Sequence, residues 1–124
     1  MTFLWVFLGG GLGSMARYGM SVLTATMFGI QFLLGTLVVN TLGSFMMGLI
    51  VEYFAAKGGL PEQGKLFLTT GFLGGFTTFS AFSMEVVLLH SKGGLLQAAS
   101  YMLVSVFLGV SSLYAGMLLI RFTA

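Results

Sequence analysis

The sequence predicts an all-α integral membrane protein with four hydrophobic helical spans in a single transmembrane domain, residues 1–124. Hydrophobic residues make up 57% of the chain and charged residues only 6%, whereas a soluble domain carries about 25% charged residues. So few charges cannot solvate a globular surface, and we expect the lipid bilayer to cover much of it. The chain has no cysteine, which excludes disulfides and thiolate metal sites.

Four stretches are long and apolar enough to cross a bilayer, which takes roughly 20 apolar residues in a helix. Lys65 and Lys92 precede the last two stretches. The uncharged stretch between Arg17 and Glu52 is too long for one span, and we divide it near Phe28–Gln31. The predicted spans are residues 3–27, 32–54, 66–90 and 95–120.

The same composition argues against several other classes of protein. Met1–Trp5 has no basic side chain, so a cleaved secretory signal is not expected. The net charge of +2 is spread along the chain and predicts no nucleic-acid partner. His90 is the only histidine, and no nucleophile–base set accompanies it, so we expect no enzymatic activity.

Four spans place both termini on one side of the membrane, together with the loop after the second span. Lys57, Lys65 and Arg121 belong to that side, against Lys92 and Arg17 toward the other. This small difference gives a weak orientation signal under the positive-inside rule. Two interpretations stay open: insertion in both orientations, which gives antiparallel assemblies, and a single orientation with cytoplasmic termini.

The first span contains a glycine-rich run, Gly9–Ser14, followed by Arg17. Such glycines are typical of close helix packing. The Arg17 guanidinium stays charged, so it has to reach water, the membrane interface or an anion. Snorkelling of its long side chain to the interface is the alternative to anion binding.

Polar and small residues recur every four positions along the second span, which sets them on one gently winding helix face. They are Thr36, Asn40, Ser44, Gly48 and Glu52. Small residues on such a face allow close helix approach, whereas the Asn40 amide needs several hydrogen-bond partners. A packing seam and a polar path therefore remain alternative interpretations.

The third span gathers glycine and threonine residues in the segment 69–78. Glycine costs about 1 kcal/mol in a helix interior relative to alanine, and β-branched threonine is also a poor helix former. These residues predict a helix that is broken at mid-membrane, where irregular backbone survives only if it is buried in protein or lines a cavity. A flexible but continuous helix is the alternative.

Phe79 and Phe82 follow the predicted break and lie three residues apart on one helix face. Their neighbours carry hydroxyl groups, and the positive edge of an aromatic ring can contact an anion without trapping it. Lipid or core packing is the alternative role. In the fourth span Tyr101 and Ser105 share a face with small residues, and the Tyr101 hydroxyl could reach a neighbouring polar path.

Three segments resemble the signature segments of the CrcB/Fluc family of fluoride channels. They are GGLGSMARY at residues 10–18, GTLVVNTLGSF at residues 35–45 and GFLGGFTTFSAF at residues 71–82. The third segment is highly specific, whereas the first alone is a weak signal. The resemblance covers essentially the whole chain, including its length and its number of spans.

The resemblance implies an antiparallel, dual-topology homodimer in the cell inner membrane, with two fluoride pores that are each built from both subunits. It implies passive fluoride efflux that protects the cell from fluoride. A structural sodium ion is implied at the dimer centre, bound by the backbone carbonyls of Gly74 and Thr77. The positions that match the family's fluoride pathway are Asn40, Phe79, Phe82, Ser80, Tyr101, Ser105, Glu85 and Arg17. Many relatives carry a hydroxyl at the position of Ala81, so one position of the polar track differs here.

Two other functions fit part of the pattern. A proton-coupled exporter of the small multidrug-resistance type also has four spans, but it needs a membrane carboxylate that binds proton and substrate in turn. Here the first span holds Arg17, and Glu52 and Glu85 lie toward span ends. An accessory subunit without transport activity is the second alternative.

Overall fold

A computed structural model describes residues 2–28, 32–59 and 61–123 of the chain, and these residues form helices and short connections without any strand. The elements in chain order are α1 (Thr2–Phe28), α2 (Phe32–Lys57), α3 (Glu62–Leu66), the π-helix η1 (Phe67–Leu73), α4 (Gly74–Phe76), α5 (Ser80–Ser91) and α6 (Leu95–Thr123). Helices occupy most of each predicted range, and residues 77–79 interrupt them within the third. The predicted division near Phe28–Gln31 falls mainly on Gly29–Gln31, which lie outside the described residues.

Three of the segments are long and apolar enough to cross a membrane: Gly35–Lys57, Glu62–Ser91 and Leu95–Thr123. The chain is thus a membrane protein with several apolar helices. The segment α1 has 27 residues but is not among these three, because its glycines, Arg17 and hydroxyl-bearing residues lower its hydropathy.

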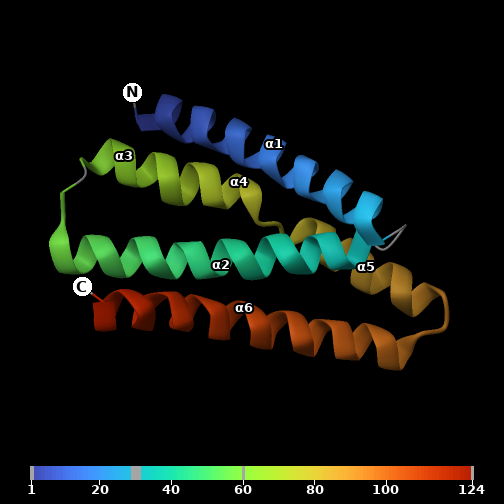
Figure 1. Cartoon of the computed structure of the whole chain (residues 1–124). Helices are drawn as coiled ribbons and strands as arrows, with labels where there is room; N and C mark the ends of the chain where they lie inside the picture. Colours follow the sequence, from blue (N-terminus) through green and yellow to red (C-terminus); the bar gives the residue numbers. More distant parts are fainter. Residues whose placement is uncertain (1, 29–31, 60, 124) are drawn as a thin grey trace.

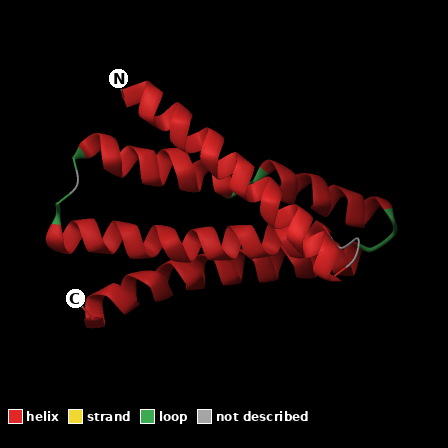
Figure 2. Ribbon diagram, turned by 45° about the horizontal axis from the view of Figure 1, so that its top comes forward, coloured by secondary structure: helices red, strands yellow, loops and turns green. Residues whose placement is uncertain are grey.

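The helices run roughly along one long direction, with α2 and α6 parallel and side by side (Figure 1). The segment from α3 to α4 lies between α1 and α2 in this view, and α5 continues it in the other half of the molecule. Figure 2 shows α1 crossing the other helices obliquely. Both marked termini lie at the same end as the connection between α2 and α3, as the topology prediction requires.

Glycines allow the closest helix contacts. A Cβ atom added at Gly13 of α1 would collide with the Phe72 carbonyl oxygen of η1. On the other side of the molecule, a Cβ atom at Gly48 of α2 would collide with the Leu113 carbonyl oxygen of α6. The backbones of these helix pairs are therefore in contact, which is how small residues drive helix association in membranes.

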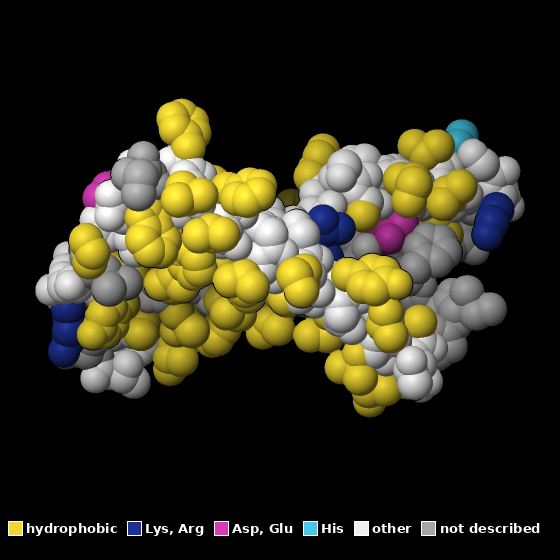
Figure 3. Space-filling model, turned by 90° about the horizontal axis from the view of Figure 1, so that it is seen from above, with side chains coloured by type: hydrophobic (Ala, Val, Ile, Leu, Met, Phe, Trp, Pro, Cys, Tyr) yellow, Lys and Arg dark blue, Asp and Glu magenta, His cyan; other side chains and the backbone are white. Residues whose placement is uncertain are grey.

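The surface of a single chain is strongly hydrophobic. The core is small and centres on Val39, Leu73 and Phe76, whereas Phe107 on α6 is 69% exposed and Phe122 is 83% exposed. Hydrophobic side chains cover much of the face seen in Figure 3. Exposed apolar surface on this scale needs a covering of lipid or of another protein chain.

The predicted helix break is confirmed. Residues Thr77–Phe79 separate α4 from α5, and Thr77 has an extended backbone (φ −85°, ψ 159°). Neither a proline nor a left-handed residue produces the break, because the positive-φ residues that the structure describes lie elsewhere, at Gly58, Gly59 and Gly93. The glycines and threonines before it weaken the helix, and side-chain contacts from neighbouring helices hold the open form.

Candidate functional site

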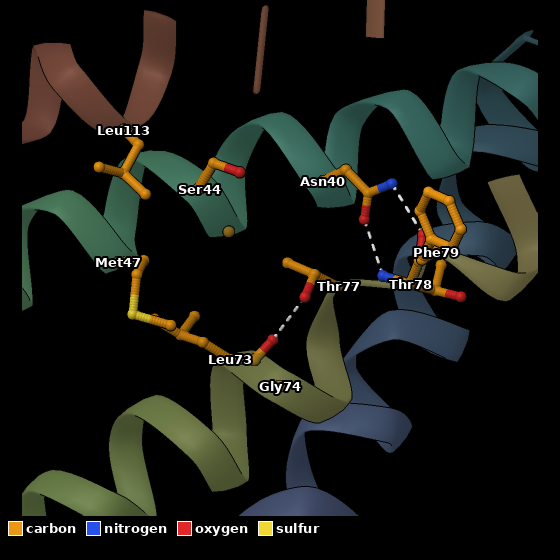
Figure 4. A pocket seen from close by; sticks show the side chains of 10 residues that line it. Asn40, Ser44, Met47, Leu73, Gly74, Thr77, Thr78, Phe79 and Leu113 are labelled. Carbon is orange, nitrogen blue, oxygen red and sulfur yellow. Dashed lines mark hydrogen bonds between the residues drawn. The ribbon is translucent and has the colours of Figure 1, made fainter. Parts of the chain in front are cut away.

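The side chain of Asn40 binds both backbone groups of Thr78 at the break. Its Nδ2 atom donates to the Thr78 carbonyl at 2.9 Å, and its Oδ1 atom accepts from the Thr78 N–H at 2.8 Å. Both hydrogen bonds are visible in Figure 4, where Asn40 points from α2 toward the interrupted segment. A side-chain amide thus substitutes for the helical partners that the break removes.

Other backbone groups of the break find partners in the same neighbourhood. The N–H and the Oγ1 hydroxyl of Thr77 both donate to the Leu73 carbonyl, at 3.0 and 2.9 Å. The N–H of Ala81 donates to Thr78 Oγ1 at 3.1 Å. Because the N–H groups of Thr78 and Ala81 are diverted, the carbonyls of Gly74 and Thr77 accept no hydrogen bond from any described residue.

Arg17 contacts the break from α1. Its Nε atom donates to the Gly75 carbonyl at 3.0 Å. Arg17 lines neither of the two cavities beside the break described below. This contact differs from both expected roles of Arg17, which were snorkelling and anion binding. The guanidinium instead binds a carbonyl near the end of α4, where helix carbonyls carry partial negative charge.

Two adjoining cavities, of about 350 and 300 Å³, lie beside the break. They share Asn40 and Ser44 of α2, Phe79 of the break and Leu113 of α6. The first also includes Gly74 and Thr77, so it reaches the two carbonyls that lack a donor. Both cavities are open on the outside of the chain, and Figure 4 shows the residues that line the first.

Three aromatic rings follow one another from the cavities into the protein. The ring centroids of Phe79 and Phe82 are 5.7 Å apart, and those of Phe82 and Tyr101 are 5.4 Å apart, with tilted planes. Phe79 is 78% exposed on the single chain, whereas Phe82 and Tyr101 are partly buried. The structure therefore brings together the aromatic residues that the sequence singled out.

Hydroxyl groups lie next to the rings. Ser105 lines the second cavity with Phe82, and its buried Oγ atom has no hydrogen-bond partner among the described residues. Ser80 is exposed, with its Oγ atom 3.4 Å from Thr78 Oγ1. Ser105 in particular offers a hydroxyl donor that the protein itself leaves unused.

Glu85 ends the row of rings as a buried carboxylate. It is 3% exposed, and its two oxygens accept hydrogen bonds from Thr36 Oγ1 and from the Tyr101 hydroxyl, both at 2.7 Å. The sequence placed Glu85 toward the end of its span but did not predict this burial or the role of Thr36. The signal that could have indicated Thr36 is its position one turn before Asn40 on the polar stripe.

The residues of the stripe on α2 lie in different surroundings. Asn40 and Ser44 line the cavities, while Gly48 packs against α6. Glu52 forms an ion pair with Arg121 at 3.3 Å. Asn40 and Ser44 thus face the cavities, and Gly48 belongs to a packing contact with α6.

The site combines neutral donors with aromatic rings, and among the described residues no lysine or arginine lines either cavity. Such a lining can attract a small anion weakly, because the positive ring edges and hydroxyl groups carry only partial charges. Fold and site together thus define a small all-helical membrane protein with an interrupted helix beside a polar and aromatic cavity.

The chain belongs to the CrcB family. The family model "CrcB-like protein, Camphor Resistance (CrcB)" matches residues 4–117, which confirms the resemblance seen in the three sequence segments.

Curated relatives match over nearly their full lengths. The chain is 54% identical over 122 residues to "Fluoride-specific ion channel FluC" of Granulibacter bethesdensis, covering 98% of this chain and 95% of that one. It is 50% identical over 121 residues to the protein of the same name from Rhodopseudomonas palustris strain BisB5, covering 98% of both. "Fluoride-specific ion channel FluC 2" of Nitrobacter hamburgensis is 46% identical over 121 residues, again covering 98% of both. Relatives of this kind confirm that the chain belongs to a family of ion channels and not of enzymes.

Proposed function

We propose that this chain is the subunit of a fluoride-selective ion channel that allows passive fluoride efflux and thereby confers fluoride resistance. The names of relatives about 50% identical to it support fluoride as the ion. The observation that carries the proposal is the cavity lining, in which Asn40, Ser105 and the rings of Phe79 and Phe82 surround one open space. The channel would sit in the cell inner membrane as a multi-pass protein, with α1 as its fourth span.

The open sides of the two cavities support assembly with a second copy of the chain. Phe79 is 78% exposed, although it lines both cavities together with polar groups. An antiparallel homodimer would close each open side with the partner subunit and give two pores. The weak charge bias is compatible with dual topology, because neither orientation is strongly favoured.

A narrow fluoride pathway has to replace the water that the ion loses, yet it must also release the ion. The free N–H of the Asn40 amide and the hydroxyls of Ser80 and Ser105 would supply the donors. Ring edges of Phe79 and Phe82 would add weak attraction between these donors. Tyr101, hydrogen-bonded to Glu85, would continue this pathway, and Arg17 would contribute positive potential near its vestibule.

The carbonyls of Gly74 and Thr77 fit a structural sodium ion at the dimer centre. Unwound backbone carbonyls are used in this way in transporters, and these two accept no hydrogen bond from the described residues. A cation there would brace the broken helices of two subunits and raise the local positive potential. It would contribute to assembly and to the electrostatics of the channel.

The structure disfavours a proton-coupled exporter. Such an exporter needs a carboxylate that alternates between proton and substrate, but Glu85 lines neither cavity and both of its oxygens are already hydrogen-bonded. Transport by such an exporter would depend on a proton gradient, whereas a channel passes fluoride down the fluoride gradient. An accessory subunit would give no flux when purified.

The ring variants Phe79→Ile and Phe82→Ile test the proposal. Each should lower fluoride efflux from proteoliposomes about tenfold, because an aromatic contact of roughly 0.5–1.5 kcal/mol is lost along the pathway. Phe107→Ile, on an exposed face of α6 away from both cavities, is the matched control and should keep its flux. If neither pore variant differs from Phe107→Ile, the rings have no part in conduction.

A further inference from the structure

We propose that Asn40 is a positioning residue that keeps the helix break open and thereby makes the Gly74 carbonyl available to a cation. This inference rests on the proposed function, since the cation is the one expected at the dimer centre. It gives Asn40 a second role, separate from any contact with fluoride.

The hydrogen bonds of Thr78 carry the first step. In a continuous α-helix its N–H would donate to the carbonyl four residues earlier, which belongs to Gly74. Instead it donates to Asn40 Oδ1 at 2.8 Å, while Asn40 Nδ2 binds the Thr78 carbonyl at 2.9 Å. The amide side chain therefore competes directly with Gly74 for the same N–H group.

The cost of an unpaired backbone group carries the second step. Leaving a part-buried N–H without a partner is unfavourable, so without Asn40 the Thr78 N–H is driven back toward the Gly74 carbonyl. That carbonyl would then be occupied within its own helix. Removal of Asn40 should therefore weaken cation binding even though Asn40 itself is not a ligand.

The location of Phe79 carries the third step. It follows Thr78 directly in the chain and lines the same two cavities as Asn40. A contact that fixes the Thr78 backbone therefore also fixes the backbone position from which the Phe79 side chain extends. Asn40 thus connects the anion cavity with the carbonyls at the break, whereas Ser44, one turn further along α2, lines both cavities without bonding to the break.

Sodium-dependent thermal stability of the purified protein tests the inference without any flux measurement. Unfolding temperatures would be recorded over a sodium series at constant ionic strength, with N-methyl-D-glucamine as the replacement cation. For Asn40→Ala we expect the apparent sodium affinity to fall about tenfold, in line with the loss of one hydrogen bond to a part-buried group. Ser44→Ala, the matched control, should keep the sodium response of the unaltered protein.

Asn40→Asp separates positioning from anion binding. Its carboxylate retains an oxygen for the Thr78 N–H but has no N–H for an anion, and its charge repels fluoride. We expect it to keep the sodium response within about threefold while fluoride efflux is lost. If Asn40→Ala yields no stable protein, Asn40→Ser replaces it, because its side chain is too short to reach both Thr78 atoms.

The outcomes distinguish this inference from the proposed function. Equal sodium responses in Asn40→Ala and the unaltered protein would overturn the inference, even if the unaltered protein conducts fluoride. A channel that conducts fluoride but shows no sodium response would overturn both the cation and the inference. Absence of fluoride flux in the unaltered protein would overturn the proposed function alone.

Discussion

Glu85 illustrates how individual residues constrain each other in this protein. A carboxyl group that is 3% exposed loses its hydration, and a buried polar group is tolerated only when hydrogen bonds replace the lost water. Thr36 and Tyr101 supply one hydrogen bond to each oxygen. The three side chains come from α2, α5 and α6, so this small network joins three helices beyond the row of rings.

Replacing Tyr101 by phenylalanine should therefore destabilise the fold. Tyr101→Phe removes the hydroxyl from one Glu85 oxygen, and a buried oxygen left without its partner costs about 1–3 kcal/mol. Thermal unfolding in detergent would measure the change. Tyr114→Phe, at an exposed position on the same helix, is the control. Equal stability of the two variants would show that the buried carboxylate does not depend on Tyr101.

Several residues of the site could be predicted from the sequence, but their partners could not. Polar side chains in an apolar segment are easily recognised in the sequence as candidates. Asn40 and Ser105 line the second cavity, and the Tyr101 ring contacts Phe82, which also lines it. The bond between Thr36 and Glu85 spans 49 positions of the chain. Its existence depends on the relative rotation and register of two helices, which periodicity within one helix does not specify.

At the scale of elements, the interrupted segment from Glu62 to Ser91 depends on its packing against α1. The π-helix η1 precedes the break and lies against the glycines of α1, where backbone meets backbone. Helices of this kind are rare and are frequently found at functional sites. The seam between α1 and η1 therefore holds the first half of the interrupted segment in place.

Gly13→Ala should weaken this seam. The added methyl group would collide with the Phe72 carbonyl oxygen, and overpacking of this kind typically costs about 1–3 kcal/mol. Gly11→Ala is the matched control, because a Cβ atom there meets nothing within 4 Å and alanine favours the helix. Thermal unfolding of both variants measures the difference. A Gly13→Ala protein as stable as Gly11→Ala would mean that the seam is not tightly packed.

The break itself was predictable in kind but not in position. Glycine and threonine lower helix propensity over the whole segment 69–78, yet η1 and α4 remain helical across most of it. The interruption falls at Thr77–Phe79, where Asn40 from another helix offers both a donor and an acceptor. Tertiary contacts thus selected one place within a region that local propensity had only weakened.

At the scale of the whole molecule, a single chain leaves its polar cavities and its apolar surface uncovered. Its cavities are open, its core is small and many large hydrophobic side chains are exposed. Lipid can cover the apolar surface, but it cannot hydrogen-bond to the polar groups that face the cavities. A second, inverted copy would satisfy both requirements, and this is the basis of the proposed antiparallel dimer.

Dual topology can be measured by cysteine labelling, since the chain has no cysteine of its own. Gln63→Cys and Ser91→Cys place a unique thiol near opposite ends of the interrupted segment without changing the charge. A membrane-impermeant thiol reagent applied from one side should label about half of the copies of each variant, since neither orientation is strongly favoured. Complete labelling of one variant and none of the other would establish a single orientation.

Fluoride selectivity tests the central claim most directly. Liposomes that contain the purified protein would be loaded with equal concentrations of fluoride and chloride. Ion-selective electrodes would then follow the efflux of each ion. Donors and ring edges set around a narrow pathway should pass fluoride at least about a hundredfold faster than chloride, a difference of about 2.7 kcal/mol in barrier height. Equal rates for the two ions would contradict the proposed fluoride pathway.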